Sequence, residues 1–524
     1  MKKNNFNQNI ISYFLWGICL ALFLYFCCHT ASFLLQTMIN IDNQAIIISI
    51  YIGSYCTATY FYIIYILNKE YKQKTERCYS TDHTLYKRSF MELIKFFQNA
   101  DPYQIQINTL PKEKWTDAEG IILGKIGDHL IKRPSEGVGN LALFSLPGGG
   151  KTTSQIIPSA MRFSGSVLAI DIKGDILHYT KKHRKIKIFS PENPNISCHY
   201  NPLDGIDKLS ISDRKIFIEQ LAAILIPDEP DGKYFTDGGR DYFCGISLFL
   251  LAADIHTPFT QIIQNILHGN AFNWIQRIIA SDCEEAKEYL ASYMGNNEKN
   301  VAGCYNTACK SIRPLNSGSL AQLLNASGDC ITPETLEKGM DIYLEIPQDK
   351  ISVYAPVLTI IIQNFMSAFM RRPDRSSGEK RRPILFLLDE FPQLQFQFNL
   401  LSAGLSTLRS KNVTLFLAQQ SIAQLEKRYG TTGCREIIDT CSYLSVMSAQ
   451  DPQSRKFFQE LIGTKKTLKI NQSKDNNGKS SKSIQEEREY IFQPEDFGNL
   501  NDKVIIIANG KYIKAEKTYC FQKI

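Results

Sequence analysis

Two long apolar stretches without charged residues open the sequence. They run from Ile10 to Leu35 and from Ala45 to Leu67. Each exceeds the roughly 20 apolar residues that an α-helix needs to cross a bilayer, whereas a signal peptide has a shorter apolar core and a cleavage site of small residues. The pattern predicts two transmembrane helices, at about residues 10–35 and 45–67, in a membrane anchor of residues 1–70. The alternative is a pair of buried core helices.

Positive charges flank both stretches. Lys2 and Lys3 precede the first, a basic group at residues 69–77 follows the second, and the loop between them has only Asp42 as a charged residue. Because positively charged flanks stay in the cytoplasm, we expect both termini and everything after about residue 70 to be cytoplasmic. The loop between the two spans would be a very short external one.

Downstream, short segments rich in apolar residues predict strands, and the continuously apolar Val167–Ile170 is typical of a parallel strand that is covered on both faces. The other predicted strands are Leu141–Phe144, Asp341–Ile346, the run Ile384–Leu388 and the segment that begins at Asn412. Residues 71–135 are mixed and polar, and we interpret them as a connector with the first strands of the core.

Between about Ile211 and Asn325 the apolar residues recur with helical spacing instead. The clearest helical segments are 216–225, 242–253, 259–267 and 274–279. A helical block between two halves of an α/β sheet predicts an inserted all-α domain, at residues 209–325. The α/β domain would then comprise residues 136–208 and 326–524.

Two further segments lie near the end of the chain. Lys465–Glu489 is rich in Asn, Ser, Lys and Glu and poor in apolar residues, so we expect a flexible loop or disordered insertion there. Val504–Ala508, the dipeptide Asn509-Gly510 and Lys511–Tyr519 predict a β-hairpin, because Asn-Gly is the preferred two-residue hairpin turn.

Composition adds little to this outline. The net charge of +7 permits nucleic acid or an anionic membrane as a partner without requiring either. The 14 cysteines include no Cys-x-x-Cys pair and have no regular spacing. We interpret them as reduced thiols and expect neither a disulfide framework nor a zinc site.

A glycine-rich loop follows the apolar run Leu141–Phe144. It reads Ser145-Leu-Pro147-Gly148-Gly149-Gly150-Lys151-Thr152-Thr153. The glycines let backbone N–H groups turn inward around phosphate oxygens, and the next helix would point its positive end at the same anion. Lys151 can reach the outer phosphates and the Thr152 hydroxyl can ligate Mg²⁺.

This is the layout of a phosphate-binding P-loop. One departure is Ser145, which stands where the strict pattern has Gly. The alternative is a glycine-rich turn without a ligand. If this stretch is a P-loop, we expect the residues from Ser145 to Thr153 to bind ATP and its magnesium ion.

A second motif decides between these readings. The apolar run Ile384–Leu388 ends in Asp389 and Glu390, as in a Walker B strand. Asp389 would hold Mg²⁺ through water, opposite Thr152, and Glu390 would act as the general base on the attacking water. Joined to the P-loop in this order, the motif predicts a P-loop NTPase.

Other polar residues end neighbouring strands. Gln420 follows the strand that begins at Asn412, where a sensor of the γ-phosphate would lie. Arg409, on the preceding helix, is either an arginine finger toward a neighbouring subunit or a solvated helix residue. Asp171, Lys173 and Asp175 follow Val167–Ile170 and form either a salt bridge within the loop or a contact to nucleotide or Mg²⁺.

The order of these parts resembles that of the type IV coupling proteins, the TraG-type ATPases of conjugation and type IV secretion. The resemblance covers nearly the whole chain. Its more family-specific stretches are Tyr200-Asn-Pro-Leu-Asp204 and Ala418-Gln-Gln-Ser-Ile-Ala-Gln-Leu425, which accompany the P-loop, Asp171–Asp175 and Leu387–Phe391. The departures from the family pattern are Ser145 and the short external loop.

This resemblance implies a RecA-like nucleotide domain, two membrane spans in a bacterial inner membrane, and a homohexamer with ATP sites between subunits. It implies a relaxase bound to single-stranded DNA as cargo, type IV secretion channel components as partners, and a basic lumen that follows DNA phosphates. The helical insertion would choose the cargo.

Three alternatives stay open. A coupling ATPase that delivers only protein effectors shares all of these motifs. A membrane-tethered translocase of the FtsK type would usually have more spans, a long linker and a winged-helix end. A membrane scaffold with a degenerate P-loop is disfavoured, because Lys151, Thr152, Asp389 and Glu390 are all present.

Overall fold

The computed structural model describes residues 104–105, 112, 117–228, 232–325, 328–375, 381–474 and 480–521. Both predicted transmembrane helices lie outside these ranges. The chain divides into two compact units. One comprises Met1–Asp101 and Lys466–Glu489, and the other comprises Pro102–Lys465 and Tyr490–Ile524.

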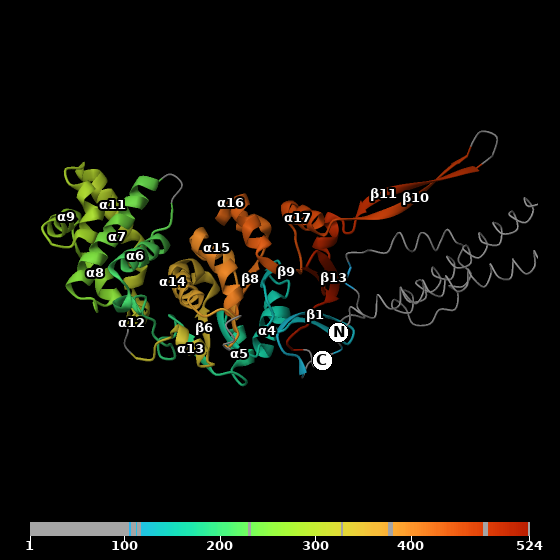
Figure 1. The fold of residues 1–524 in the computed structure, drawn as a ribbon, viewed down its shortest axis with the longest axis horizontal. Coiled ribbons are helices and arrows are strands. Elements are labelled where there is room, and N and C mark those ends of the chain that lie inside the picture. The colour runs from blue at the N-terminus through green and yellow to red at the C-terminus, as the bar shows by residue number, and fades with distance from the viewer. Residues whose placement is uncertain are drawn as a thin grey trace, which may run out of the picture. The chain divides into compact units, whose positions relative to one another are not determined.

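A mixed sheet forms the centre of the larger unit (Figure 1). Within the described residues it has 11 strands, in the order β2-β1-β13-β12-β9-β3-β8-β7-β4-β6-β5. The strands, in chain order, are β1 (Ile121–Ile126), β2 (His129–Arg133), β3 (Asn140–Phe144), β4 (Ser166–Ile172), β5 (Ile186–Phe189), β6 (Asp341–Ile346), β7 (Ile384–Leu388), β8 (Val413–Gln419), β9 (Cys441–Val446), β12 (Lys503–Ala508) and β13 (Lys511–Glu516).

Strand direction divides this sheet into two parts. From β9 to β5 every neighbouring pair is parallel, whereas β12, β13, β1 and β2 pair antiparallel along the other edge. The loops after β3, β4, β7, β8 and β9 therefore emerge at one edge of the sheet. In open α/β sheets this carboxyl edge is where ligands bind.

Alternate residues of the parallel strands face two separate apolar cores. In β3, Leu141 and Leu143 pack with α4 (Ile157–Arg162) and α5 (Asp175–Thr180), while Ala142 and Phe144 join the larger core on the other face. That face carries α14 (Ile351–Met370), α15 (Phe398–Thr407) and α16 (Ile422–Asp439), as Figure 1 shows. Burial on both faces explains why these strands are predominantly apolar.

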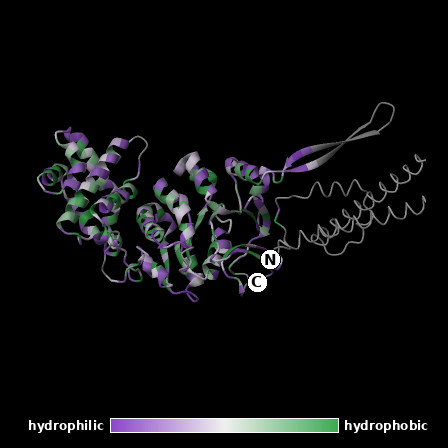
Figure 2. Cartoon of the chain, in the orientation of Figure 1, coloured by the Kyte–Doolittle hydropathy of each residue, from purple (hydrophilic) through white to green (hydrophobic). Residues whose placement is uncertain are grey.

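Between β5 and β6 the chain is helical. The helices are α6 (Ile211–Leu225), α7 (Lys233–Ala253), α8 (Phe259–His268), α9 (Ala271–Ile279), α10 (Glu284–Leu290), α11 (Glu298–Ile312), α12 (Gly318–Leu323) and α13 (Pro333–Glu337). Figure 2 shows hydrophobic residues gathered inside this bundle and hydrophilic ones on its outward faces. The helical content is as predicted, whereas the boundaries of a separate domain at 209–325 stay a prediction.

Four of these helices, α10, α11, α12 and α13, have no counterpart among the segments predicted from the sequence. In α11, the small residues Cys304 and Ala308 lie against two glycines of α7, and a Cβ on Gly238 would lie 2.3 Å from the Sγ atom of Cys304. Close backbone approach at these glycines replaces some of the large apolar side chains, although Tyr305 of α11 still packs on Tyr242 of α7. The helical periodicity is consequently weak in the sequence.

One helical stretch within the described ranges is long and apolar enough to cross a membrane. It is Gln348–Met370, and 67% of its most apolar window is buried inside the fold. This stretch contains α14, which packs against the parallel sheet as a core helix.

The segment Lys465–Glu489 differs from its prediction. A flexible loop or disordered insertion was predicted there, and this prediction is wrong, because β10 (Thr464–Lys474) and β11 (Ser480–Tyr490) form a two-stranded sheet. Thr467 Oγ1 also donates a hydrogen bond to the Glu487 carbonyl across the pair, at 3.3 Å. A two-stranded ladder satisfies backbone groups without an apolar core, so composition alone did not reveal it.

The predicted hairpin at the end of the chain is confirmed. Strands β12 and β13 pair antiparallel from Lys503 to Glu516. The turn residues Asn509 and Gly510 have φ of 52° and 66°, as the favoured type I′ hairpin turn requires.

A buried ion pair ties the amino ends of three parallel strands together. Asp341, at the start of β6, is 1% exposed and accepts bonds from the Val167 amide at 2.9 Å and from Nη2 of Arg184 at 3.0 Å. Arg184 also donates to the carbonyls of Phe163 and Gly165. Burial raises the pKa of Asp341, against the opposing effect of Arg184.

Asp341→Ala should therefore destabilise the fold by about 3–5 kcal/mol, since it leaves the largely buried Arg184 guanidinium without its carboxylate partner. Urea unfolding of the purified chain, followed by circular dichroism, measures this loss. Glu516→Ala is the control, because Lys503 and Glu516 form an exposed pair worth at most about 1 kcal/mol. Equal losses in the two variants would contradict this role of Asp341.

Candidate functional site

The glycine-rich loop leaves the carboxyl end of β3. Gly148 and Gly150 have φ of 75° and 85°, a left-handed conformation that side chains disfavour. Gly149 is required for a different reason, because a Cβ there would lie 2.3 Å from Oγ of Ser145. All three glycines of the predicted P-loop are thus needed by its shape.

Ser145, the departure from the strict motif, fits the loop well. It is completely buried, and its amide donates to the Gln419 carbonyl at 3.1 Å. It does not belong to the described residues with positive φ. This position therefore does not demand glycine in this chain, and the hydroxyl fills the space that Gly149 leaves free.

The helix after the loop begins with a π-helical turn, Thr152–Ile156, and continues as α4. The Ser154 amide and hydroxyl both donate to the Gly150 carbonyl, at 2.9 Å and 2.7 Å. Its first turn contains no acidic residue, so the positive end of the helix is available to an anion. Thr152 and Thr153 are half-buried at this end.

Lys151 meets both acids of the second motif. Its ammonium lies 2.9 Å from Oδ1 of Asp389 and forms an ion pair with Oε1 of Glu390. All three residues are at most 9% exposed. Burial acts to lower the pKa of Lys151, but the two carboxylates outweigh it and hold that pKa above its ordinary value. Burial raises the pKa of Asp389, and Lys151 opposes this rise.

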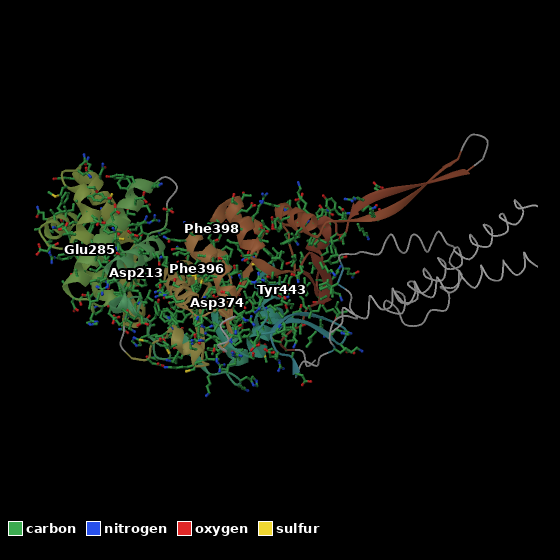
Figure 3. The ribbon with its side chains drawn as sticks, viewed as in Figure 1. Asp213, Glu285, Asp374, Phe396, Phe398 and Tyr443 are labelled. Carbon is green, nitrogen blue, oxygen red and sulfur yellow. The ribbon has the colours of Figure 1, made fainter. Side chains whose placement is uncertain are left out.

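Glu390 has an unusual backbone conformation. Its φ and ψ are 50° and 39°, and a left-handed conformation at a non-glycine residue costs on the order of 1–3 kcal/mol. The next residue, Phe391, is buried and stacks on Phe396 and Tyr429 with ring centroids 5.9 Å apart in each pair. Phe396 is labelled in Figure 3 together with Phe398, which also packs on Tyr429. This aromatic cluster holds the strained turn.

Gln420 lies where the sequence pattern predicted. It directly follows β8, and its Nε2 donates to Oε2 of Glu390 at 3.0 Å. The Glu390 carboxylate is thus held on one oxygen by Lys151 and on the other by Gln420. Four of the predicted site residues, Lys151, Asp389, Glu390 and Gln420, form one hydrogen-bonded group.

Arg409 does not join this group. It is exposed on the 3₁₀ turn Leu408–Lys411, which precedes β8. Because β8 and β3 are parallel, that turn lies at the amino edge of the sheet, opposite the P-loop. Arg409 therefore cannot act on the P-loop of its own chain.

Asp171 has a structural role that neither prediction for this loop included, and the predicted contact to nucleotide or Mg²⁺ stays a prediction. Its carboxylate accepts bonds from the amides of Ile176 and Leu177, at 3.1 Å and 2.8 Å, in the first turn of α5. Burial, together with Glu345 and Asp175, raises the pKa of Asp171 to about 6, against the effect of these two bonds. The carboxylate thus caps the helix.

Two site residues were missed by sequence reasoning. Ser448, after β9, accepts a bond from the Leu146 amide at 3.0 Å. Lys517, after β13, is buried and donates to the carbonyls of Gly149 and Asn501, at 2.9 Å and 2.5 Å. Both steady the P-loop from positions more than 300 residues away, and no local pattern marks them.

Comparison with known proteins places this arrangement in a family. The family model described as "Type IV secretory system Conjugative DNA transfer" matches residues 108–523. The chain is 22% identical over 408 residues to a type IV secretion system-coupling protein VirD4 of Bartonella quintana, covering 71% of this chain and 61% of the relative. A probable conjugal transfer protein TraG of Sinorhizobium fredii is 24% identical over 408 residues, covering 73% and 62%.

Solved structures agree on the fold. The unbound bacterial conjugative coupling protein TrwBdeltaN70 matches with a TM-score of 0.60 at 16% identity, covering 78% of this chain and 89% of that one. TrwB in complex with ADP and Mg²⁺ matches with a TM-score of 0.56 at 15% identity, covering 82% and 92%.

The chain spans about three fifths of the length of the VirD4 and TraG relatives named above. The family match covers most of the described residues, including the P-loop, the acidic pair and the helical block. The chain belongs to the type IV secretory system conjugative DNA transfer family, the family of the type IV secretion coupling proteins.

Proposed function

We propose that this chain is a membrane-anchored coupling ATPase, which recruits a relaxase–DNA complex and drives single-stranded DNA through a type IV secretion channel during conjugation. The observation that carries the proposal is the hydrogen-bonded group of Lys151, Asp389, Glu390 and Gln420 beside a P-loop in a member of this family. This group contains what nucleoside triphosphate hydrolysis requires of a protein.

The residues present fit ATP with Mg²⁺. The loop has no side chain at Gly148, Gly149 and Gly150, so its backbone can approach phosphate oxygens closely. The Thr152 hydroxyl and the Asp389 carboxylate are hard oxygen donors, as Mg²⁺ prefers, and few protein ligands are the rule for this ion. When bound, the metal ion would neutralise charge that develops on the phosphates. TrwB was solved in complex with ADP and Mg²⁺ and with ATP and GTP analogues.

Each side chain then has a defined role. Lys151 would leave its ion pairs with the acids and turn to the β- and γ-phosphates, which frees the Glu390 carboxylate to accept a proton from the attacking water. Gln420, which already bonds Glu390, would orient that water. The closed Lys151 ion pairs keep both acids satisfied until a phosphate group competes for the ammonium.

The finer architecture is also part of this proposal. The α/β unit would be a RecA-like domain, the apolar stretches before residue 70 would anchor it in a bacterial inner membrane, and six copies would form a ring. The location of Arg409 fits such a ring, because an exposed arginine at the amino edge of one sheet could reach a P-loop only on a neighbouring subunit.

The helical block would choose the cargo. A cavity of about 1320 Å³ lies between α8, α9 and the segment Asn201–Asp207, which includes the Asn-Pro-Leu-Asp stretch. Its lining is rich in carboxamides and contains Asp204, Asp207 and Arg277. Because acids outnumber the single arginine, this cavity suits a polar protein segment better than bare phosphates, which supports a contact to the relaxase.

The same observations bear on two alternative functions, a translocase of the FtsK type and a coupling ATPase for protein effectors alone. The family match disfavours a translocase of the FtsK type. A coupling ATPase for protein effectors alone has the same site, and only its response to DNA distinguishes it. Conjugative transfer in cells that carry variants of this chain tests the proposal directly.

Lys151→Ala should abolish both ATP turnover and plasmid transfer, because it removes the cation that reaches the β- and γ-phosphates. Glu390→Gln should retain ATP binding and lower turnover by about 10²- to 10⁴-fold, the usual contribution of a general base. Turnover, ATP affinity and transfer frequency are measured in parallel. Lys181→Ala, an exposed lysine, is the control. Hydrolysis at the wild-type rate in Lys151→Ala would show that the P-loop assignment is wrong.

Arg409→Ala should impair hydrolysis while ATP binding stays intact. If the arginine acts in trans, mixing Arg409→Ala with Glu390→Gln subunits should restore part of the turnover, since some interfaces then combine an intact arginine with an intact base. Arg435→Ala, an exposed arginine on α16, serves as the control. Mixed subunits that stay inactive would remove the support for a finger in trans.

A further inference from the structure

A short segment after β13 covers the P-loop. Within this segment, Lys517–Phe521, Lys517 donates to the Gly149 carbonyl and the Cys520 amide donates to the Thr153 carbonyl, each at 2.9 Å. The ring of Tyr519 also lies against the loop, since a Cβ on Gly150 would be 3.3 Å from its Cε1 atom. We call Lys517–Phe521 the strap.

The strap presents two stacked aromatic rings. Tyr519 and Phe521 have ring centroids 5.2 Å apart and an interplanar angle of 18°. The Tyr519 hydroxyl donates to Oδ1 of Asp502 at 3.0 Å, which fixes that ring, while Phe521 is 62% exposed. The fixed ring of Tyr519 therefore packs against one face of the exposed Phe521 ring, and both rings lie beside the P-loop.

Strand order places the strap on one particular side of the P-loop. In the sheet, β8 and β7 lie on one side of β3, and β9, β12 and β13 lie on the other. The acids follow β7, so they approach the loop from the first side. Two antiparallel steps, from β9 to β12 and from β12 to β13, make β13 run in the same direction as β3. The strap consequently starts at the P-loop edge, from the side opposite the acids.

A nucleotide bound in a P-loop has its γ-phosphate at one end of the loop and its nucleoside at the other. The lysine reaches the β- and γ-phosphates, and the loop and helix amides hold the α- and β-phosphates. Since Lys151 lies against Asp389 and Glu390, the γ-phosphate end belongs on their side. The nucleoside must then lie on the other side of the loop, where the Cys520 amide of the strap bonds to the Thr153 carbonyl.

We propose that Tyr519 and Phe521 form the stacking platform for the base of the bound nucleotide. The inference rests on the proposed nucleotide-binding function of the P-loop. It names the ligand chemistry as a nucleoside attached to a triphosphate. Because every base has a π-face, stacking adds affinity without discriminating strongly between bases, so ATP and GTP should both gain from the platform.

The test compares nucleotides with a ligand that has the phosphates and no base. Isothermal titration of the purified full-length chain gives the dissociation constants of ATP, GTP and inorganic tripolyphosphate, each with Mg²⁺. Phe521→Ala removes the exposed ring, and Tyr519→Phe keeps the stack while it removes the bond to Asp502. Phe272→Ala, an exposed ring on α9, is the control.

We expect Phe521→Ala to weaken ATP and GTP binding about fivefold or more and to leave tripolyphosphate affinity unchanged. Tyr519→Phe should have a smaller effect of the same kind. Equal weakening of all three ligands would overturn the platform, because it would indicate a loosened P-loop. Unchanged affinity for the nucleotides would overturn it as well. If the wild-type chain binds neither ATP nor tripolyphosphate, the proposed function fails, and the platform fails with it.

Discussion

The site depends on the burial of one ammonium group between two adjacent carboxylates. Asp389 and Glu390 end an apolar strand in the middle of the sheet, where an unpaired charge is costly. Lys151 contacts both acids, and these contacts connect the loop after β3 with the turn after β7. Such an arrangement is stable, but a strong competing anion can reorganise it. The ion pairs therefore suit a site that must change when a triphosphate binds.

Parallel strands make this meeting possible. The lysine, the acids and Gln420 come from three neighbouring strands, β3, β7 and β8, whose carboxyl ends share one edge. The antiparallel flank then brings Lys517 and the strap to the same edge from the other side. The chemistry of phosphate transfer and the recognition of the nucleoside would thus be separated by the P-loop itself. Arg409 could contribute to hydrolysis only at the P-loop of a neighbouring subunit, because it lies at the opposite edge of its own sheet.

The sequence predicted the parts of the fold whose signal is local. Runs rich in apolar residues located β3, β4, β6, β7 and β8, and the Asn509-Gly510 turn located the last hairpin. The group around Glu390 was predicted because Asp389, Glu390 and Gln420 follow such runs and Lys151 ends the glycine-rich loop after another. Ser448 and Lys517 were missed, since their contacts to Leu146 and Gly149 arise only in the folded sheet. The hairpin of β10 and β11 was missed because backbone pairing there needs no apolar pattern. Helix α11 was missed because small residues replace some of the large apolar ones where it meets α7.

In the proposed function, ATP hydrolysis at this site is coupled to DNA. The most direct measurement is the rate of ATP hydrolysis by the purified full-length chain, with and without single-stranded DNA, over a range of salt concentrations. We predict that single-stranded DNA stimulates turnover and that the stimulation declines as salt rises, because phosphate contacts release counterions. If neither single- nor double-stranded DNA changes the rate at any salt concentration, the chain is not a DNA-coupled ATPase.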